Sequence, residues 1–171
     1  MKNYLVLILL LAINSLSNAQ IEKSNTEAST FYFIRHAEKD RSDNKNKNPN
    51  LTQQGVLRAA KWSLVLQETN FDAVYSTNYN RTKQTAKPTA EKNGLMLTIY
   101  NPMKLDVANF LNINRGKKIL VVGHSNTTPA MVNAIIGTDK YSQIEDRNNS
   151  NLYIISISPS GELSDFMLVV D

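Results

Sequence analysis

Cysteine is absent from the 171 residues, and histidine occurs only twice. Without cysteine the chain can form no disulfide framework, use no thiolate nucleophile and carry no lipid on a cysteine. The two histidines lack the i, i+4 spacing and the accompanying carboxylate cluster of a typical metal site. We therefore expect no metal and no other cofactor.

The sequence also has little excess charge of either sign. Lysine and arginine number 19 against 15 acidic residues, which gives a formal net charge of +4. The cations are scattered, and no basic stripe with interleaved aromatic residues is present, so we expect no nucleic acid as a partner. A mildly basic chain of this kind suits an anionic small-molecule or protein substrate.

The first 19 residues are typical of a secretory signal peptide. Lys2 precedes an apolar run at 4–13, and Ala19 ends a small-residue cleavage site. The alternatives are an N-terminal membrane anchor or a buried helix. No other segment has the length and apolarity to span a bilayer. We therefore expect a signal peptide at 1–19 and one domain at 20–171, secreted or periplasmic, with no stable membrane insertion after cleavage.

Short apolar runs rich in β-branched and aromatic residues alternate with helical patterns along the chain. We expect strands at 31–35, 72–76, 95–100, 118–122, 152–157 and 166–170, and helices at 52–68, 81–93, 103–112 and from 127 or 128 to 136. This alternation predicts an α/β fold, a three-layer sandwich with a mostly parallel central sheet and helices on both faces.

Two local features of this pattern carry further expectations. In the first helix, Leu57, Ala60 and Leu64 recur on one face with Trp62, Val65 and Leu66 alongside, which favours a helix with an apolar face. The polar, proline-ended run at 39–49 cannot contribute to a core, so it is a loop. It is either a mobile lid over a site or a solubilising surface loop.

Both histidines stand at the end of an apolar strand-like run. His36 follows residues 31–35, and His124 follows residues 119–123. A third polar segment, 76–86, leaves another strand and contains Arg81. Because the carboxyl ends of parallel strands meet at one rim of the sheet, we expect these segments to form a single site.

The residue types in these segments suit a phosphoryl group. The guanidinium groups of Arg35 and Arg81 can hold phosphate oxygens in bidentate fashion and cannot lose their charge. A neutral imidazole can act as a nucleophile and split group transfer into two steps. A helix that opens near Asn126 would add free N–H groups and a favourable dipole.

The three segments resemble the motifs of the histidine phosphatase superfamily, also called the phosphoglycerate mutase-like group. The family's Arg-His-Gly stands here as Arg35-His36-Ala37. Its Ser-x-x-x-Arg-[Thr/Ala]-x-x-Thr-Ala matches 77–86 with threonine in the serine place, and its Gly-His-Ser matches 123–125. The resemblance covers most of the chain beyond residue 19.

This resemblance implies a role for each matching residue. His36 would be the phosphorylated nucleophile, and His124 would stabilise the transferring phosphoryl group. Arg35 and Arg81 would bind that group, and Lys39 would be a further basic contact. Asn126 lies close enough in sequence to touch substrate.

The identity of the general acid is left open. Asp106 lies in the region where many members of the family carry it, although an aspartate in the first turn of a helix is favoured by the dipole anyway. Glu38 is the other carboxylate near the nucleophile, and we expect it to brace a loop or an arginine. Some small members lack a dedicated acid and cleave better leaving groups.

The resemblance therefore implies a phosphatase, specifically a metal-independent phosphomonoester hydrolase with a phosphohistidine intermediate on His36. One alternative is a phosphohistidine or phosphoprotein phosphatase. Another is a catalytically silent phosphate-binding module, suggested by the alanine at position 37 and by the uncertain acid.

Overall fold

The computed structural model describes residues 27–171. The expected signal peptide lies outside the described residues. Six strands form one sheet in the order β3-β2-β4-β1-β5-β6. The strands are β1 (Ser29–Arg35), β2 (Ala73–Thr77), β3 (Leu97–Tyr100), β4 (Lys118–Gly123), β5 (Asn151–Ile157) and β6 (Leu163–Val169).

Five strands of the sheet run in one direction, and β5 runs against them. β1, β2, β3 and β4 pair in parallel, β5 pairs antiparallel with β1, and β6 pairs antiparallel with β5. The two C-terminal strands therefore extend the sheet as a hairpin on one side. This arrangement confirms the expected α/β fold with a mostly parallel sheet.

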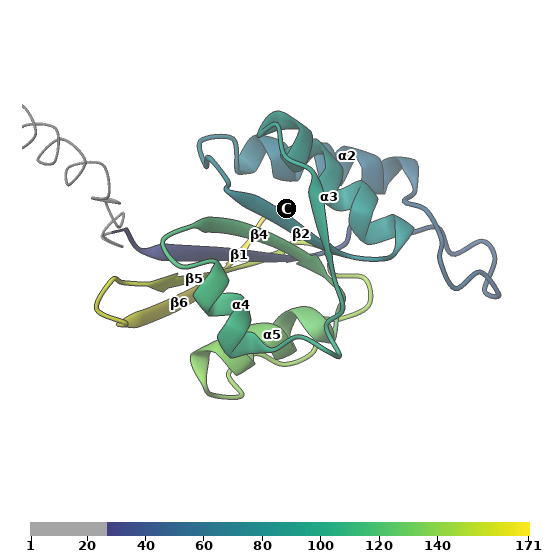
Figure 1. Cartoon of the computed structure of the whole chain (residues 1–171). Helices are drawn as coiled ribbons and strands as arrows, with labels where there is room; N and C mark the ends of the chain where they lie inside the picture. Colours follow the sequence, from purple (N-terminus) through teal and green to yellow (C-terminus); the bar gives the residue numbers. More distant parts are fainter. Residues whose placement is uncertain (1–26) are drawn as a thin grey trace, which may run out of the picture.

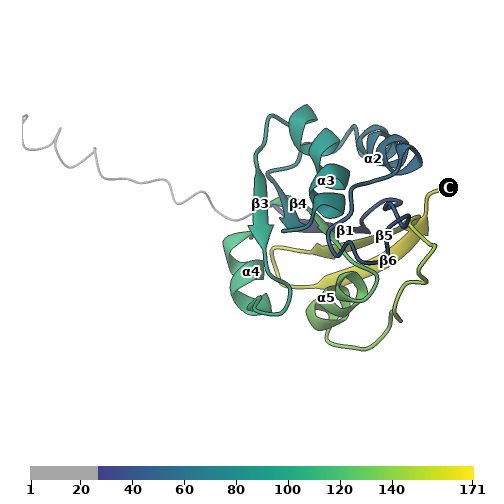
Figure 2. The same cartoon turned by 90° about the vertical axis from the view of Figure 1, so that its right-hand side faces the viewer.

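Helices cover both faces of the sheet. α2 (Gln53–Val65) and α3 (Asn80–Lys92) lie on one face, and α4 (Val107–Ile113) and α5 (Thr127–Ile136) lie on the other (Figures 1 and 2). Side chains that alternate along β1 pack on opposite faces of the sheet. Phe31 and Phe33 belong to a core cluster with α4 and α5, while Ile34 belongs to a cluster with Trp62 of α2. The molecule is thus a three-layer sandwich with a core on each side of the sheet.

Only part of the apolar set noted in the first helix faces the core: Trp62 and Leu66 are buried. Leu57 and Leu64 are 66% and 65% exposed, whereas the buried face carries Gly55, Ala59 and Trp62. The large indole sets the inward direction. Gly55 lies so close to the backbone of Glu38 that an added Cβ would collide with its carbonyl oxygen.

Several element boundaries also differ from the expected ones. α4 begins at Val107 rather than at 103, and the last strand runs from Leu163 to Val169 rather than from 166 to 170. α5 is capped at Asn126, so Pro129 stands in its first turn and not at its first position; the helix ends at Gly137, as expected, with a φ of 75°.

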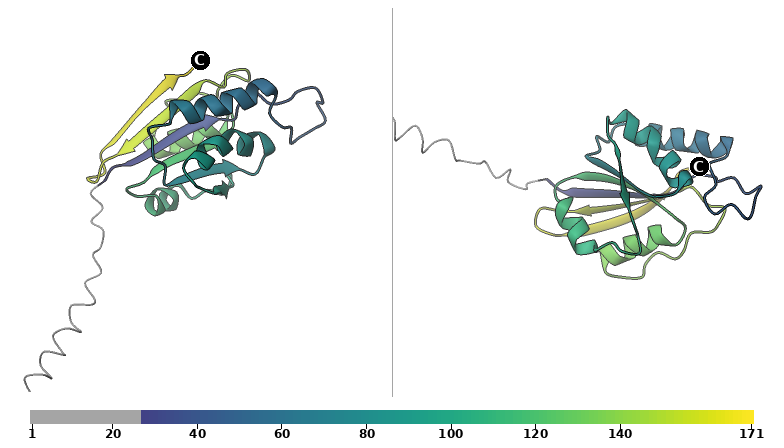
Figure 3. Two further views of the ribbon diagram at one scale, coloured as in Figure 1. Left: turned by 90° about the horizontal axis from the view of Figure 1, so that it is seen from above. Right: turned by 45° about the vertical axis from the view of Figure 1, so that its right-hand side comes forward.

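The segment between β1 and α2 is a loop that projects from one end of the domain (Figure 3). A single bridge between Lys39 and Leu51 closes its base. Within residues 27–171 no helix is both long and apolar enough to cross a membrane.

Candidate active site

Six of the seven expected site residues line a single hollow of about 390 Å³. It opens at the carboxyl ends of β1, β2 and β4, where the sequence placed it. The six are Arg35, His36, Lys39, Arg81, His124 and Asn126. Only Asp106 is not among the residues that line it.

Strand register explains why the two histidines meet. β1 and β4 are parallel neighbours, and Arg35 pairs with Gly123 at their ends, so the next residue of each strand is a histidine. The backbone N–H of His36 donates to the carbonyl of Gly123 at 3.0 Å. The two imidazole rings then lie edge to face with their centroids 5.6 Å apart.

His36 has the protonation state that a nucleophile needs. Its Nδ1 lies 2.8 Å from the carbonyl oxygen of Ala37, and because a carbonyl only accepts, Nδ1 carries the proton. In the neutral ring Nε2 therefore holds a free electron pair. Burial, followed by the charges of Arg35 and Arg81, lowers the pKa of His36 to about 3. The ring is thus neutral at physiological pH.

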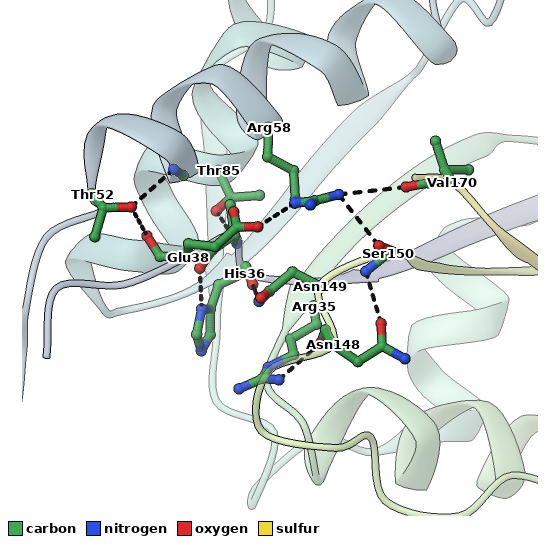
Figure 4. Close-up of polar contacts among 12 residues, drawn as sticks. Arg35, His36, Glu38, Thr52, Arg58, Thr85, Asn148, Asn149, Ser150 and Val170 are labelled. Atoms are coloured by element: carbon green, nitrogen blue, oxygen red, sulfur yellow. Dashed lines mark hydrogen bonds and ion pairs between the residues drawn. The ribbon is translucent and has the colours of Figure 1, made fainter.

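The loop that carries His36 is fixed by bonds from distant elements. Asn149 donates through Nδ2 to the carbonyl of His36 at 2.6 Å, and Thr85 of α3 accepts from the N–H of Ala37 at 2.9 Å (Figure 4). Ala37 is fully buried, and in the described part of the chain only glycines have positive φ. Alanine in the family's glycine place therefore causes no backbone strain.

A chain of hydroxyl groups sets the protonation of His124. Thr82 donates to backbone carbonyls, so its oxygen accepts from the hydroxyl of Thr77 at 3.0 Å. The oxygen of Thr77 must then accept from Nε2–H of His124, 2.9 Å away. His124 consequently presents the free pair of Nδ1 to Nη2 of Arg81, at 3.4 Å.

The ring of Tyr79 packs against both Arg81 and His124. The Cζ atom of Arg81 lies 4.4 Å from the centroid of the Tyr79 ring, and His124 meets the same ring edge to face at 5.1 Å. Burial, with Arg81 next, lowers the pKa of His124 to about 4. Both imidazoles are therefore neutral in the empty site, and a bound anion would favour protonation of His124.

Arg35 is almost entirely enclosed, with 2% of its surface exposed. Its Nη1 donates to the carbonyls of Glu145 and Asn148 at 2.7 and 2.9 Å, and its Nη2 contacts the Asp146 carboxylate at 3.0 Å. Its Nε–H is buried without a partner, as is that of Arg81. Each of the two guanidinium groups therefore keeps one buried N–H without a protein partner.

The other two expected binding residues lie at the edge of the hollow. Lys39 lines it and also a neighbouring hollow of about 300 Å³, and burial lowers the pKa of its ammonium group. Asn126 is exposed and caps α5 without a side-chain hydrogen bond to the helix. Its amide is thus free to contact a ligand.

The two carboxylates proposed as the acid have other partners. Asp106 is exposed and caps α4 by accepting from the N–H of Asn109 at 3.1 Å. Glu38 forms an ion pair with Nε of Arg58 at 2.6 Å, and Arg58 reaches on to Ser150 and to the carbonyl of Val170 (Figure 4). Glu38 therefore braces an arginine, as expected.

Tyr79 and Asp146 are among the residues of the hollow that the sequence analysis did not assign to the site. Tyr79 is 41% exposed and lines the hollow beside Arg81. Asp146 also lines the hollow, although it lies 111 positions from Arg35 in the sequence. No local pattern marks a single aspartate in a long polar loop, whereas Tyr79 could have been found from its place within the 77–86 motif.

Comparison with known proteins gives a family match over part of the chain. The model of the histidine phosphatase superfamily (branch 1) matches residues 31–104. That segment contains His36 and Arg81, while His124 lies beyond it and is brought to them by the pairing of β1 with β4. None of the curated proteins compared with the chain matches it.

Solved structures share the fold at low sequence identity. The protein histidine phosphatase SixA, complexed with tungstate, is 15% identical, with a TM-score of 0.64 over 82% of this chain and 96% of that one. A phosphoglycerate mutase from Bacillus anthracis is 14% identical, with a TM-score of 0.66 over 86% of this chain and 95% of that one. A mutant phosphoserine phosphatase from Entamoeba histolytica, in complex with phosphoserine, is 14% identical, with a TM-score of 0.62 over 80% of this chain and 94% of that one.

Proposed function

Because this chain belongs to the histidine phosphatase superfamily and is a phosphatase enzyme, we propose that it hydrolyses phosphate monoesters through a phosphohistidine on His36. The observation that carries the proposal is the orientation of this ring. Its Nδ1–H is fixed on the Ala37 carbonyl, which leaves the free electron pair on Nε2, and the residue lines the same hollow as Arg35 and Arg81.

The reaction would proceed in two displacements. In the first, Nε2 attacks phosphorus, the ester P–O bond breaks and the leaving oxygen takes up a proton. In the second, water attacks the same phosphorus, the P–N bond breaks and orthophosphate leaves. The guanidinium groups of Arg35 and Arg81, which line the hollow, would stabilise the equatorial oxygens in both transition states.

His124 would assist by gaining a proton when the phosphoryl group binds. In the empty site its Nδ1 accepts weakly from Arg81, and a dianion beside it favours the imidazolium form. The protonated ring then donates to a phosphoryl oxygen.

Labelling tests the nucleophile directly. The chain is incubated with an aryl phosphate, quenched and digested with trypsin, which cuts after Arg35 and Lys39 and releases residues 36–39. We expect acid-labile phosphate on this peptide. His36→Ala should abolish the label and lower the turnover by about 10³-fold or more. His124→Ala is the matched control, since it removes the other imidazole and should leave label on His36. Full turnover by His36→Ala would overturn the proposal.

A phosphohistidine or phosphoprotein phosphatase is the second candidate. It is favoured by the exposed rim of the hollow, where residues 40–47 and 145–147 are open to solvent, because such a rim can meet a protein surface. Hydrolysis of phosphohistidine peptides in preference to sugar phosphates and aryl phosphates would support it. Binding of orthophosphate without label or turnover would instead indicate a silent phosphate-binding module.

We also propose that the protein is exported, on the basis of the signal-like residues 1–19. Mass spectrometry of the mature protein from the producing cell should place its N-terminus at Gln20, in the periplasm or the medium. An intact N-terminus in the cytoplasmic fraction would contradict this.

A further inference from the structure

A carboxylate stands inside the hollow that is proposed to receive a phosphoryl group. Asp146 bridges two arginines: one oxygen is 3.0 Å from Nη2 of Arg35, and the other is 2.8 Å from Nη1 of Arg41. The residue is 67% exposed, whereas Arg35 is enclosed. Asp146 also lines the neighbouring hollow beside Lys39, so it lies at the boundary between the two.

The orientation of Arg35 does not depend on this carboxylate. The carbonyls of Glu145 and Asn148 already accept from its Nη1, and Figure 4 shows the guanidinium group against the backbone near Asn148. Two backbone acceptors on one nitrogen fix the plane of the group. The carboxylate of Asp146 therefore adds a negative charge beside Arg35 but is not needed to orient the guanidinium group.

The same carboxylate uses a donor that a phosphoryl group needs. Bidentate binding of phosphate takes two N–H groups from the arginine fork. The two carbonyls leave three N–H groups, one on Nε and two on Nη2; the Nε–H is buried without a partner, and Nη2 donates to Asp146. An incoming anion therefore meets a like charge on the Nη2 nitrogen that it would share.

Arg41 provides a place to which the carboxylate can withdraw. It is 48% exposed at the rim and holds Asp146 by both its carboxylate and its backbone carbonyl. The hydrogen bonds from Arg41 and Arg35 hold the pKa of Asp146 below its usual value, so the group stays ionised at neutral pH. If the Asp146 side chain turns away from Arg35, the hydrogen bond from Arg41 to its backbone carbonyl does not depend on that rotation.

Resting on the proposed function, we propose that Asp146 is an internal anion that occupies Arg35 in the empty site and is displaced by the phosphoryl group of the substrate. Every anion must then compete with a tethered carboxylate for the Nη2 nitrogen of Arg35. The competition weakens orthophosphate as well as substrate. Asp146 thereby limits inhibition by the product and speeds its release.

Binding of inorganic orthophosphate to the purified chain tests this inference, measured by titration calorimetry at neutral pH. Asp146→Asn should bind orthophosphate about tenfold more tightly, an effect of about 1.4 kcal/mol. Asp146→Ala, which leaves no side-chain acceptor at this position, should do the same. Glu145→Gln is the matched control, because it removes the same charge from the same exposed loop while only the backbone carbonyl of that residue contacts Arg35. Its affinity should stay within about twofold of the original.

Unchanged or weaker binding by both Asp146 variants would overturn the inference, since the carboxylate would then be neutral or would help to position Arg35. An equal gain in Glu145→Gln would also overturn it, because general electrostatics would explain the result. In each of these cases the original chain still binds orthophosphate and the proposed function stands. Absence of binding in every chain would defeat the proposed function and this inference together.

Discussion

The hydroxyl of Thr77 lies 2.9 Å from Nε2 of His124 and determines which ring nitrogen carries the proton. The hydrogen of Thr77 is committed to Thr82, and that of Thr82 is committed to a carbonyl, so the relay has one direction. Threonine in the family's serine place therefore keeps the hydroxyl group and loses nothing needed for this bond.

Removal of the Thr77 hydroxyl should lower both stability and turnover without abolishing activity. In Thr77→Val the Nε2–H of His124 loses its acceptor, so we expect a cost of about 1–2 kcal/mol in the free energy of unfolding. A loosened ring should also lower kcat by about 10- to 100-fold. Thr77→Ser keeps the hydroxyl group and should behave like the original chain. Urea denaturation and steady-state kinetics measure both effects; equal kcat values for the valine and serine variants would contradict the relay.

The ring of Tyr79 should act on binding rather than on chemistry. It lies under the guanidinium group of Arg81, 4.4 Å from its carbon, and its hydroxyl has no part in that contact. A cation–π contact of this exposure is worth about 0.5–1 kcal/mol. Tyr79→Ala should therefore raise KM about two- to fivefold with little change in kcat, and Tyr79→Phe should match the original chain. A larger loss in the phenylalanine variant than in the alanine variant would show that the hydroxyl matters instead.

Glu38 and Arg58 should stabilise the loop of His36 against the C-terminal strand. Each of the two side chains is about one-fifth exposed, and Arg58 also contacts the carbonyl of Val170. Loss of a charged hydrogen bond in such a place costs about 1.5–3 kcal/mol. We expect Glu38→Gln and Arg58→Met each to lower the free energy of unfolding by this amount, and the double variant to cost clearly less than the sum. Strict additivity in urea denaturation would show that the two side chains are not coupled.

The local motifs made much of the site predictable. Arg35, His36 and His124 follow apolar runs that can only be buried strands, and two parallel strands bring such ends together. Arg81 opens a helix at the end of a third strand, so its place follows from the same rule. These positions depend on short-range pattern and on one topological rule.

The rest depends on contacts that a linear pattern does not encode. The apolar pattern of α2 does not tell which of its residues face the sheet: Leu57 and Leu64 are exposed, while the larger Trp62 is buried. Asp146 stands in a loop far along the chain, and only the folded backbone brings it to Arg35. Asp106 fits a catalytic position by count, yet its side chain caps α4.

Acid should destabilise the folded protein through its histidines. Burial lowers the pKa of His36 to about 3 from an ordinary value of 6.5, so below pH 6.5 the unfolded chain binds a proton that the folded chain does not. The free energy of unfolding therefore falls as the pH drops from 7 to 5, by up to about 1.4 kcal/mol per pH unit for this group. His124, with a pKa of about 4, acts in the same direction. In His36→Asn the amide can still donate to Ala37, and urea denaturation should give a shallower pH dependence. An unchanged slope would contradict the lowered pKa.

Two substitutions at Asp106 separate a capping role from proton donation. The side chain accepts from the N–H of Asn109, and asparagine caps a helix as well as aspartate does. If capping is its role, Asp106→Asn should keep the stability and turnover of the original chain, and Asp106→Ala should lower the free energy of unfolding by about 1 kcal/mol. If Asp106 donates the proton, Asp106→Asn should lose activity on alkyl phosphates by about 10²-fold or more and much less on aryl phosphates, whose leaving groups need no acid. Its exposed position outside the hollow leads us to expect the first result. Kinetics of both variants on an alkyl and an aryl ester decide between the two roles, and a selective loss on the alkyl ester would restore Asp106 as the acid.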